Sequence, residues 1–280
     1  MIPSLARNDA WRPLFLPPYK GEIAENYATP EFLAFLADPN ALLSGPGTEI
    51  LLAGRNTVAA VKDAPAGRPA EGIVVKSFGA RGISRLKSLV QPSKAAKAWR
   101  GAVALVESGF GTAGPIAYLE RRRGGFVRES YFVAERLTGG REIRFLFREL
   151  PAAKLEPLLA ALAGELVRVH AAGLLHRDLS DGNILVESAG DGFRFVFLDT
   201  NRVRSRARLG SMARARNLVR LGVPAAHRPY FLECYAAAAG HPLRPGFTLC
   251  YRAAKAAFSG WIVLKKKLKL KKLARKLKIQ

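Results

Sequence analysis

A single stretch of the sequence holds residue types that suit phosphoryl transfer. Residues 176–183 read HRDLSDGN, which places Asp178 and Asn183 five residues apart. Asp199 follows further along the chain, and Lys76 ends a Val-Val-Lys segment far upstream. Transfer of a phosphoryl group from ATP requires a neutralised triphosphate, a held magnesium ion and an aimed acceptor hydroxyl. Together these four residues can meet all three needs.

Each of these side chains suits a different part of that reaction. Asp178 is expected to face the acceptor hydroxyl as the catalytic base, and the Asn183 carbonyl to face magnesium. Asp199 would complete the metal site, because hard cations prefer oxygen ligands. Lys76 can contact the α- and β-phosphates as a point charge. His176 is expected to be structural and to support the loop.

The alternative interpretation of this stretch is a polar turn with an Asx cap between a helix and a strand. The positions of Lys76 before it and Asp199 after it favour the kinase interpretation instead.

The surrounding pattern predicts the elements that would position these residues. Apolar and β-branched segments predict strands at 49–53, 57–61, 73–76, 115–119 and 130–134. Helices are predicted at 93–108 and 152–171, and a hairpin at 183–186 with 195–198. Residues 1–47 show one short helix candidate, and residues from 207 to about 264 read as helical. A strand-rich first half before a helix-rich second half favours an α+β protein with two lobes.

Composition narrows the class of protein. The chain has 280 residues and is 49% hydrophobic, which is ample for a core and argues against global disorder. Its two cysteines, Cys234 and Cys250, and four histidines suggest neither a disulfide framework nor a structural zinc site. We find no signal peptide and no apolar run of the roughly 18 residues that a spanning helix needs. The protein is therefore expected to be cytoplasmic.

The formal net charge of +23 implies a polyanionic partner. Residues 264–280 hold nine Lys or Arg and no acid, interspersed with Leu. This composition predicts adsorption to an anionic bilayer, with Trp261 and Ile262 at the interface. A solvated, disordered tail is the alternative. Binding of nucleic acid is unlikely on this sequence, since no stacking platform or helix-turn-helix pattern accompanies the basic run.

A second basic segment runs from Arg202 to Arg220, with seven Arg and no acid. Its arginines, Arg202 and Arg204 first, are candidates to clamp phosphates or carboxylates of the acceptor, because Arg binds such groups bidentately. A solvated helix face with ordinary salt bridges is the equal alternative.

The residues after the hairpin resemble one kinase family. Leu198-Asp199-Thr200-Asn201-Arg202 stands where protein kinases have Asp-Phe-Gly, and it resembles the Asp-Leu-Asn-Arg of lipopolysaccharide kinases of the Kdo/WaaP family. The segments 74–78, 111–115 and 217–221 also fit that family, so the resemblance covers roughly 48–235. No Ala-Pro-Glu motif follows Asp199, which argues against an ordinary protein kinase.

The resemblance implies a protein-kinase-like fold that uses ATP and Mg²⁺ to phosphorylate Kdo or heptose in the lipopolysaccharide inner core. The acceptor would be the core and lipid A glycan, at the inner face of the inner membrane. The resemblance also implies that the backbone from Glu135 to Leu137 binds adenine and that Gly54 lies near the phosphates. An atypical Ser/Thr/Tyr protein kinase and a non-catalytic, membrane-bound pseudokinase scaffold are the alternatives.

This assignment divides the chain into four parts. We expect an N-terminal extension at 1–47, a nucleotide-binding N-lobe at 48–137, a C-lobe at 138–258 and a basic, membrane-adsorbing tail at 259–280.

One departure from the kinase pattern concerns the partner of Lys76. The predicted helix at 93–108 should offer a mid-helix Glu to this lysine. No acid occurs between residues 72 and 106, and Glu107 stands at the helix end. Three possibilities follow: Glu107 reaches in, Lys76 pairs with Asp199, or the salt bridge is absent.

Overall fold

The computed structural model describes residues 11–65, 69, 71–79, 86–190, 192–243 and 245–277. The chain divides into two compact units. The first comprises Met1–Arg141 and Leu185–Ser205, and the second comprises Glu142–Ile184 and Arg206–Gln280.

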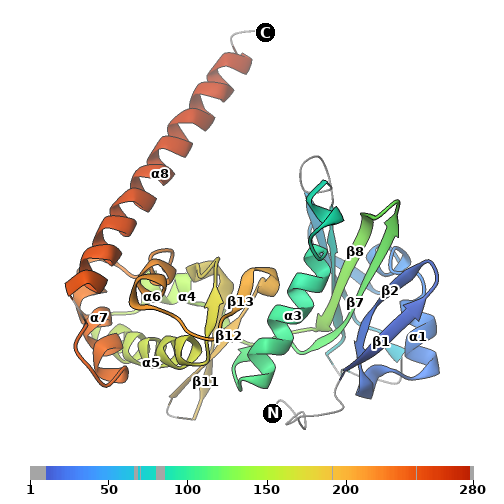
Figure 1. The fold of residues 1–280 in the computed structure, drawn as a ribbon, viewed down its shortest axis with the longest axis horizontal. Coiled ribbons are helices and arrows are strands. Elements are labelled where there is room, and N and C mark those ends of the chain that lie inside the picture. Colours follow the sequence, from blue (N-terminus) through green and yellow to red (C-terminus); the bar gives the residue numbers. More distant parts are fainter. Residues whose placement is uncertain are drawn as a thin grey trace. The chain divides into compact units, whose positions relative to one another are not determined.

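A seven-stranded antiparallel sheet is the framework of the first unit (Figure 1). Its strand order is β1-β2-β7-β8-β5-β4-β3. The strands are β1 (Trp11–Leu16), β2 (Tyr19–Ala24), β3 (Thr48–Leu52), β4 (Asn56–Val61), β5 (Ile73–Phe78), β7 (Pro115–Arg123) and β8 (Phe126–Glu135). Lys76 lies opposite Val58 of β4 and Phe132 of β8. The lysine therefore stands on an interior strand, paired on both sides.

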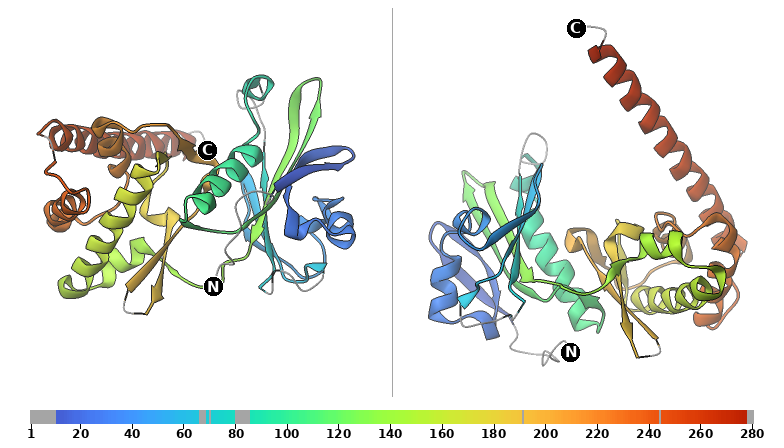
Figure 2. Two further views of the ribbon diagram at one scale, coloured as in Figure 1. Left: turned by 60° about the horizontal axis from the view of Figure 1, so that its bottom comes forward. Right: turned by 180° about the vertical axis from the view of Figure 1, so that it is seen from behind.

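Residues 11–24, part of the predicted N-terminal extension, form two strands of this sheet. The β1–β2 hairpin pairs with β7, and η1 (Glu25–Tyr27), α1 (Pro30–Leu36) and η2 (Ala41–Leu43) follow it (Figure 2). Leu14, Ile23 and Phe32 are buried in the same apolar cluster as Trp99 and Val133. Prolines and a glycine in 11–24 conceal the strand pattern from a reading by propensity.

Helix α3 (Lys94–Glu107) lies against β5, β7 and β8, as predicted for a helix in this segment (Figure 1). Ser93 caps it by accepting a hydrogen bond from the Ala96 N–H at 3.0 Å. Gly101 allows an unusually close approach, since a Cβ there would lie 2.1 Å from the Thr200 carbonyl oxygen. The helix thus packs directly on the residues that follow Asp199.

The first unit also holds a second, smaller sheet. The predicted hairpin is confirmed as β11 (Ile184–Ala189) and β12 (Gly192–Phe197), and β12 pairs in parallel with β6 (Gly111–Thr112). The remaining short elements of the unit are η4 (Lys87–Leu89), η6 (Thr200–Arg202) and β13 (Val203–Ser205), while β9 (Arg141–Glu142) spans the boundary between the units.

The second unit is mainly helical, as predicted. It contains α4 (Ile143–Glu149), α5 (Ala152–Ala171), β10 (Leu174–His176), η5 (Asp181–Asn183), α6 (Ser211–Leu218), η7 (Ala225–His227), α7 (Arg228–Ala238) and α8 (Pro245–Leu277). The apolar stripe predicted for α5 is buried throughout and consists of Leu155, Leu158, Leu159, Leu162, Leu166 and Val169. Helix α5 packs on α7, and α6 packs on α8.

The side chains of helix α8 (red in Figure 1) become more exposed along its length. Phe247 and Tyr251 near its start are buried, whereas Trp261 and Leu268 are about half exposed. The structure assigns helix up to Leu277, and it describes side chains only part of the way along the predicted basic tail. Among the described residues, no helix is both long and apolar enough to cross a membrane.

Candidate active site

The loop that carries Asp178 follows β10 in the second unit and is fixed by His176. This histidine is 3% exposed, and its Nδ1 accepts a hydrogen bond from the Asp178 N–H at 3.3 Å. Its backbone carbonyl accepts from the Asn217 amide at 2.8 Å. His176 therefore supports the loop, in agreement with the sequence prediction.

Behind the loop lies a buried hydrogen-bonded chain that the sequence analysis missed. His170 Nε2 lies 2.9 Å from Asn217 Oδ1, and its Nδ1 lies 2.7 Å from the Tyr235 hydroxyl. Because the Asn217 amide nitrogen donates to His176, its oxygen must accept, so Nε2 of His170 carries the proton. Burial lowers the pKa of His170 to about 4. The one signal in the sequence is a polar residue within the apolar stripe of α5.

Asn183 is oriented by Asp178 itself. Its Nδ2 donates to the Asp178 backbone carbonyl at 2.8 Å. The same carbonyl accepts from the Ser180 N–H at 2.7 Å, and the Asn183 N–H donates to the Ser180 carbonyl at 2.9 Å. The amide donor is thus committed to the loop, and Oδ1 is the atom of Asn183 that can serve a cation.

Arg220 forms an ion pair with the Asp178 carboxylate. A guanidinium nitrogen lies 2.5 Å from Oδ1, and the two side chains are 39% and 16% exposed. From the sequence alone, Arg220 is one of seven arginines in a basic segment, and no partner is predicted for it.

In the first unit, Asp199 combines an unusual backbone with a matching ion pair. Its φ of 54° and ψ of 49° lie in the left-handed region, the one such non-glycine conformation among the described residues. Its Oδ1 accepts from Lys76 Nζ at 2.5 Å and from Asn201 Nδ2 at 3.0 Å. A left-handed backbone held at this place is typical of functional sites, where strain is retained for geometry.

The structure also answers the question of the partner of Lys76. Of the three possibilities, pairing with Asp199 is the one observed. Glu107 instead accepts a hydrogen bond from the Trp11 indole at 3.4 Å. Helix α3 brings a cation, Lys94, near the pair: burial and then the charges of Arg55 and Arg202 lower the pKa of its amine, and Asp199 and Lys76 also act on it.

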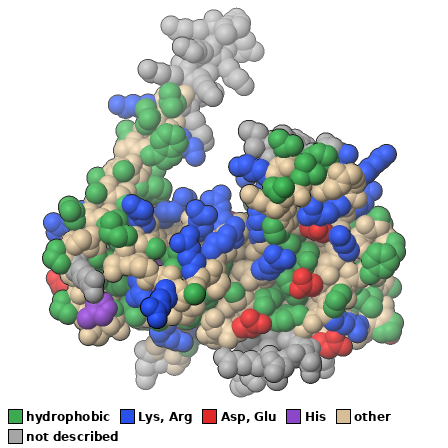
Figure 3. Space-filling view, in the orientation of Figure 1, with side chains coloured by type: hydrophobic (Ala, Val, Ile, Leu, Met, Phe, Trp, Pro, Cys, Tyr) green, Lys and Arg blue, Asp and Glu red, His purple; other side chains and the backbone are tan. Residues whose placement is uncertain are grey.

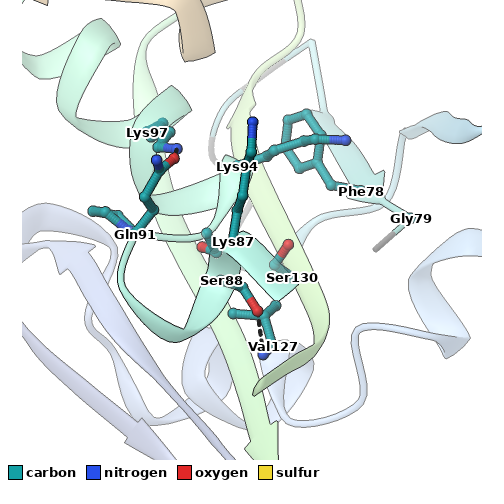
Figure 4. A pocket seen from close by; sticks show the side chains of 11 residues that line it. Phe78, Gly79, Lys87, Ser88, Gln91, Lys94, Lys97, Val127 and Ser130 are labelled. Atoms are coloured by element: carbon teal, nitrogen blue, oxygen red, sulfur yellow. Dashed lines mark hydrogen bonds between the residues drawn. The ribbon is translucent and has the colours of Figure 1, made fainter. Parts of the chain in front are cut away.

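A pocket of about 190 Å³ lies at the start of α3 and is rich in lysine (Figure 4). Lys87, Lys94 and Lys97 line it together with Phe78. Burial and the charge of Arg204 lower the pKa of Lys97. On the face seen in Figure 3, Lys and Arg side chains clearly outnumber Asp and Glu. Among the described residues that line the pocket there are three lysines and no Asp or Glu, so the pocket is positively charged and suits a polyphosphate.

The remaining predicted residues are placed as follows. Gly54 lies in the turn between β3 and β4, where a Cβ would meet nothing within 4 Å. Arg204 donates to the backbone carbonyls of Asn201 and Val203 at 3.0 and 2.6 Å, so it braces its own segment. Arg202 is exposed on η6.

The segment predicted to bind adenine lies at the end of β8. The Glu135 N–H donates to the Gly114 carbonyl at 2.8 Å, and the Arg136 N–H donates to the Gly72 carbonyl at 3.0 Å. The Glu135 and Arg136 N–H groups are therefore already used within the first unit.

The donor chemistry suits magnesium. In the described part of the chain, no group of three or more His, Cys, Asp or Glu side chains could hold a metal ion. Mg²⁺ characteristically takes one or two carboxylates and completes its shell with water and substrate phosphates. The Asn183 amide oxygen and the Asp199 carboxylate are hard oxygen donors of this kind.

Comparison with known proteins agrees with the predicted fold. The chain is similar to the solved structure of WaaP in complex with acyl carrier protein, with 22% identity, a TM-score of 0.55, and coverage of 78% of this chain and 91% of that one. The kinase domain of PknI from Mycobacterium tuberculosis is also similar, with 17% identity, a TM-score of 0.41, and coverage of 77% and 97%. No curated protein sequence matches significantly.

The family comparison is more specific. Residues 84–229 match the Lipopolysaccharide kinase (Kdo/WaaP) family. The matched range includes Asp178, Asn183 and Asp199 but not Lys76. Because it spans more than half of the chain, this protein belongs to the lipopolysaccharide kinase (Kdo/WaaP) family and is a phosphotransferase that acts on a sugar hydroxyl.

Proposed function

We propose that the protein uses ATP and Mg²⁺ to phosphorylate a hydroxyl of Kdo or heptose in the lipopolysaccharide inner core. The observation that carries the proposal is the geometry of the 176–183 loop. Asn183 gives its amide donor to the Asp178 carbonyl at 2.8 Å, which frees its oxygen for a cation. The Asp178 carboxylate stands on the same loop and is 16% exposed.

The catalytic roles follow from the chemistry of each side chain. Asp178 accepts the proton of the attacking sugar hydroxyl and orients that oxygen. Asn183 and Asp199 are the proposed magnesium ligands, through Oδ1 of Asn183 and the carboxylate of Asp199. When bound, magnesium neutralises charge on the phosphates. Lys76, positioned on an interior strand, offers its ammonium to the α- and β-phosphates.

Nucleotide recognition is assigned to the first unit. The Glu135 carbonyl and the Leu137 N–H are the proposed adenine contacts, because the intervening Arg136 N–H is already used. Gly54 and its neighbours are proposed to cover the phosphates. The positive region around Lys94 supports this assignment, since burial and then the charges of Arg55 and Arg202 lower the pKa of Lys94, and a bound polyanion would stabilise its charged form.

The acceptor is anionic and membrane-borne, and two features suit it. Arg202 and Arg204 are proposed to contact phosphates or carboxylates of the core and lipid A glycan. The basic end of α8, residues 264–280, is proposed to adsorb on the inner face of the inner membrane. Each cation near such a surface contributes about 1 kcal/mol.

The proposal is tested by presenting γ-labelled ATP and Mg²⁺ with two acceptor classes. One is lipopolysaccharide inner core stripped of phosphate, and the other is a mixture of proteins with free Ser, Thr and Tyr. We expect label on the glycan, loss of labelling when Mg²⁺ is chelated, and none with Asp178→Asn. Mass spectrometry of the labelled sugar identifies Kdo or heptose. Label confined to polypeptide would overturn the assignment, and absence of nucleotide binding would support a pseudokinase.

A further inference from the structure

Arg220 links helix α8 to the carboxylate of Asp178, because it contacts both. Arg220 follows α6 and pairs with Asp178 at 2.5 Å. On its other side, the guanidinium lies over the ring of Phe258 in α8, 5.3 Å from the centroid. Stacking on an aromatic ring restricts a guanidinium and leaves its nitrogens free to donate in the ring plane.

Lys255, one helical turn before Phe258, holds the backbone on both sides of Arg220. Its Nζ donates to the Val219 carbonyl at 2.7 Å and to the Leu221 carbonyl at 2.9 Å. These carbonyls lie just beyond the last turn of α6, where helical partners run out. Burial lowers the pKa of Lys255, and the charge of Arg228 acts in the same direction. The two hydrogen bonds fix the turn from which Arg220 projects.

The same turn meets the 176–183 loop at a second point. A Cβ on Gly222 would lie 2.1 Å from a carboxylate oxygen of Asp181, so the Asp181 side chain would have to move to admit one. The 219–222 turn is therefore packed against the loop at both Asp178 and Asp181.

We propose that Arg220 is a positioning residue for Asp178, and that Lys255 and Phe258 of α8 hold Arg220 in place. The inference rests on the proposed role of Asp178 as the catalytic base. A planar guanidinium fixes one carboxylate oxygen and so aims the other, which is the oxygen that would face the acceptor hydroxyl. Helix α8 is in this way part of the catalytic apparatus as well as the carrier of the basic tail.

The opposite role is physically conceivable and predicts the opposite result. If Arg220 merely occupied Asp178 and blocked it, its removal would raise turnover. Positioning predicts lower turnover on removal and recovery when a guanidinium is restored. Direction of change therefore decides between the two.

The decisive experiment measures kcat and KM separately for full-length variants. Arg220→Gln is expected to lower kcat ~10–100-fold, the range for losing a charged hydrogen bond, with KM for Mg-ATP nearly unchanged. Arg220→Lys keeps the charge but loses the planar fork, and is expected to recover part of kcat. Guanidinium ion added to Arg220→Ala is expected to raise its kcat. Phe258→Leu, which keeps an apolar contact but removes the ring face, is expected to lower kcat several-fold.

Arg148→Gln is the matched control, since Arg148 is an exposed arginine of α4 outside the 202–220 segment, and wild-type kinetics are expected for it. Unchanged or raised kcat in Arg220→Gln overturns the inference. If Arg220→Gln does not fold, Phe258→Leu and Arg220→Lys carry the test, and wild-type kcat in both overturns it. Asp178→Asn distinguishes failure of the proposed function from failure of this inference. Full turnover in Asp178→Asn would show that Asp178 is not the base. Lost turnover in Asp178→Asn, together with wild-type kcat in the Arg220 variants, would exclude only the role of Arg220.

Discussion

Asp178 and Asp199 each form a close ion pair with a cation, but the two cations are held in place by different parts of the structure. Each carboxylate meets a cation at 2.5 Å, Arg220 in one case and Lys76 in the other. Lys76 belongs to an interior strand of the seven-stranded sheet. Arg220 belongs to a short turn after α6 that depends on contacts from α8. One cation is held by backbone pairing and the other by side chains.

The segments that carry the two aspartates are also held differently, by backbone packing at Asp199 and by histidine side chains at Asp178. Asp199 is locked in a left-handed conformation, and Thr200 beside it donates to the Ala98 carbonyl of α3 at 2.8 Å. The Asp178 loop is held through His176, and behind it through the titratable side chain of His170. We therefore expect the Asp199 side to be sensitive to backbone packing. The Asp178 side should be sensitive to pH and to changes in α8.

The largest expected effect is on turnover and on Mg-ATP binding, which should respond differently to substitution of the two aspartates. Asp178→Asn removes the proposed base, and turnover is expected to fall by ~10²–10⁴-fold, the usual contribution of such a group. Mg-ATP binding should be preserved. Asp199→Asn is expected to weaken Mg-ATP binding as well, because it removes a charged metal ligand. Asn tolerates the left-handed backbone, so folding should survive.

Titration calorimetry with Mg-ATP, alongside single-turnover kinetics, measures both effects. ATP without metal is the control, and it should not distinguish Asp199→Asn from Asp178→Asn. Equal loss of Mg-ATP affinity in both variants would contradict separate roles.

The next largest effect is a pH dependence that originates on the Asp178 side. Burial holds the pKa of His170 at about 4 in the folded chain, against about 6.5 when unfolded. The unfolded chain therefore takes up the proton first as pH falls. The stability that comes from keeping His170 neutral is fully present above pH ~6.5 and is lost as the pH falls to ~4. The loss amounts to about 3 kcal/mol in the free energy of unfolding.

Denaturant unfolding of the wild type and His170→Gln between pH 7 and 4.5 measures how much of the pH dependence of the free energy of unfolding comes from His170. The glutamine is neutral throughout, so the fall in the free energy of unfolding should be shallower in the variant. Parallel curves for the two proteins would show that His170 does not titrate in this window.

A smaller effect tests the packing that holds Asp199. Gly101→Ala places a methyl group 2.1 Å from the Thr200 carbonyl oxygen, so α3 or the Asp199 segment must shift. Overpacking of this kind costs about 1–3 kcal/mol. Gly164→Ala in α5 is the matched control, because a Cβ there meets nothing within 4 Å, and helix propensity should stabilise it by about 0.5–1 kcal/mol. Thermal unfolding measures both, and equal shifts would contradict the tight contact.

Much of this arrangement could be predicted from sequence because it is local. The 176–183 loop, the stripe of α5 and the β11–β12 hairpin depend on residues close together in the chain, and their patterns survive in a single sequence. The pairing of Lys76 with Asp199 was foreseen as one of three possibilities, since the absence of an acid between residues 72 and 106 left few partners.

The rest depends on contacts between distant residues that no local pattern records. The β1–β2 hairpin joins the sheet by pairing with β7, and the prolines of the segment hide its alternation. Arg220, in the turn after α6, lies over the ring of Phe258 in α8, and nothing in the basic segment distinguishes this arginine from its exposed neighbours. Asn217 was visible within a family segment, but its bond to the His176 carbonyl was not.

The smallest expected effect on chemistry tests where the support of Asp178 ends along α8. Truncation after Val263 removes the nine cations of residues 264–280 but keeps Lys255 and Phe258. Since those two residues hold the turn around Arg220, kcat on a soluble glycan should stay within about 2-fold of wild type. Sedimentation with anionic vesicles should show weakened binding, because each lost cation contributes about 1 kcal/mol at the surface, and wild-type binding should itself weaken as salt rises. A loss of kcat without loss of vesicle binding would place the support of Asp178 beyond Phe258, and the distal helix would then serve the loop rather than the membrane.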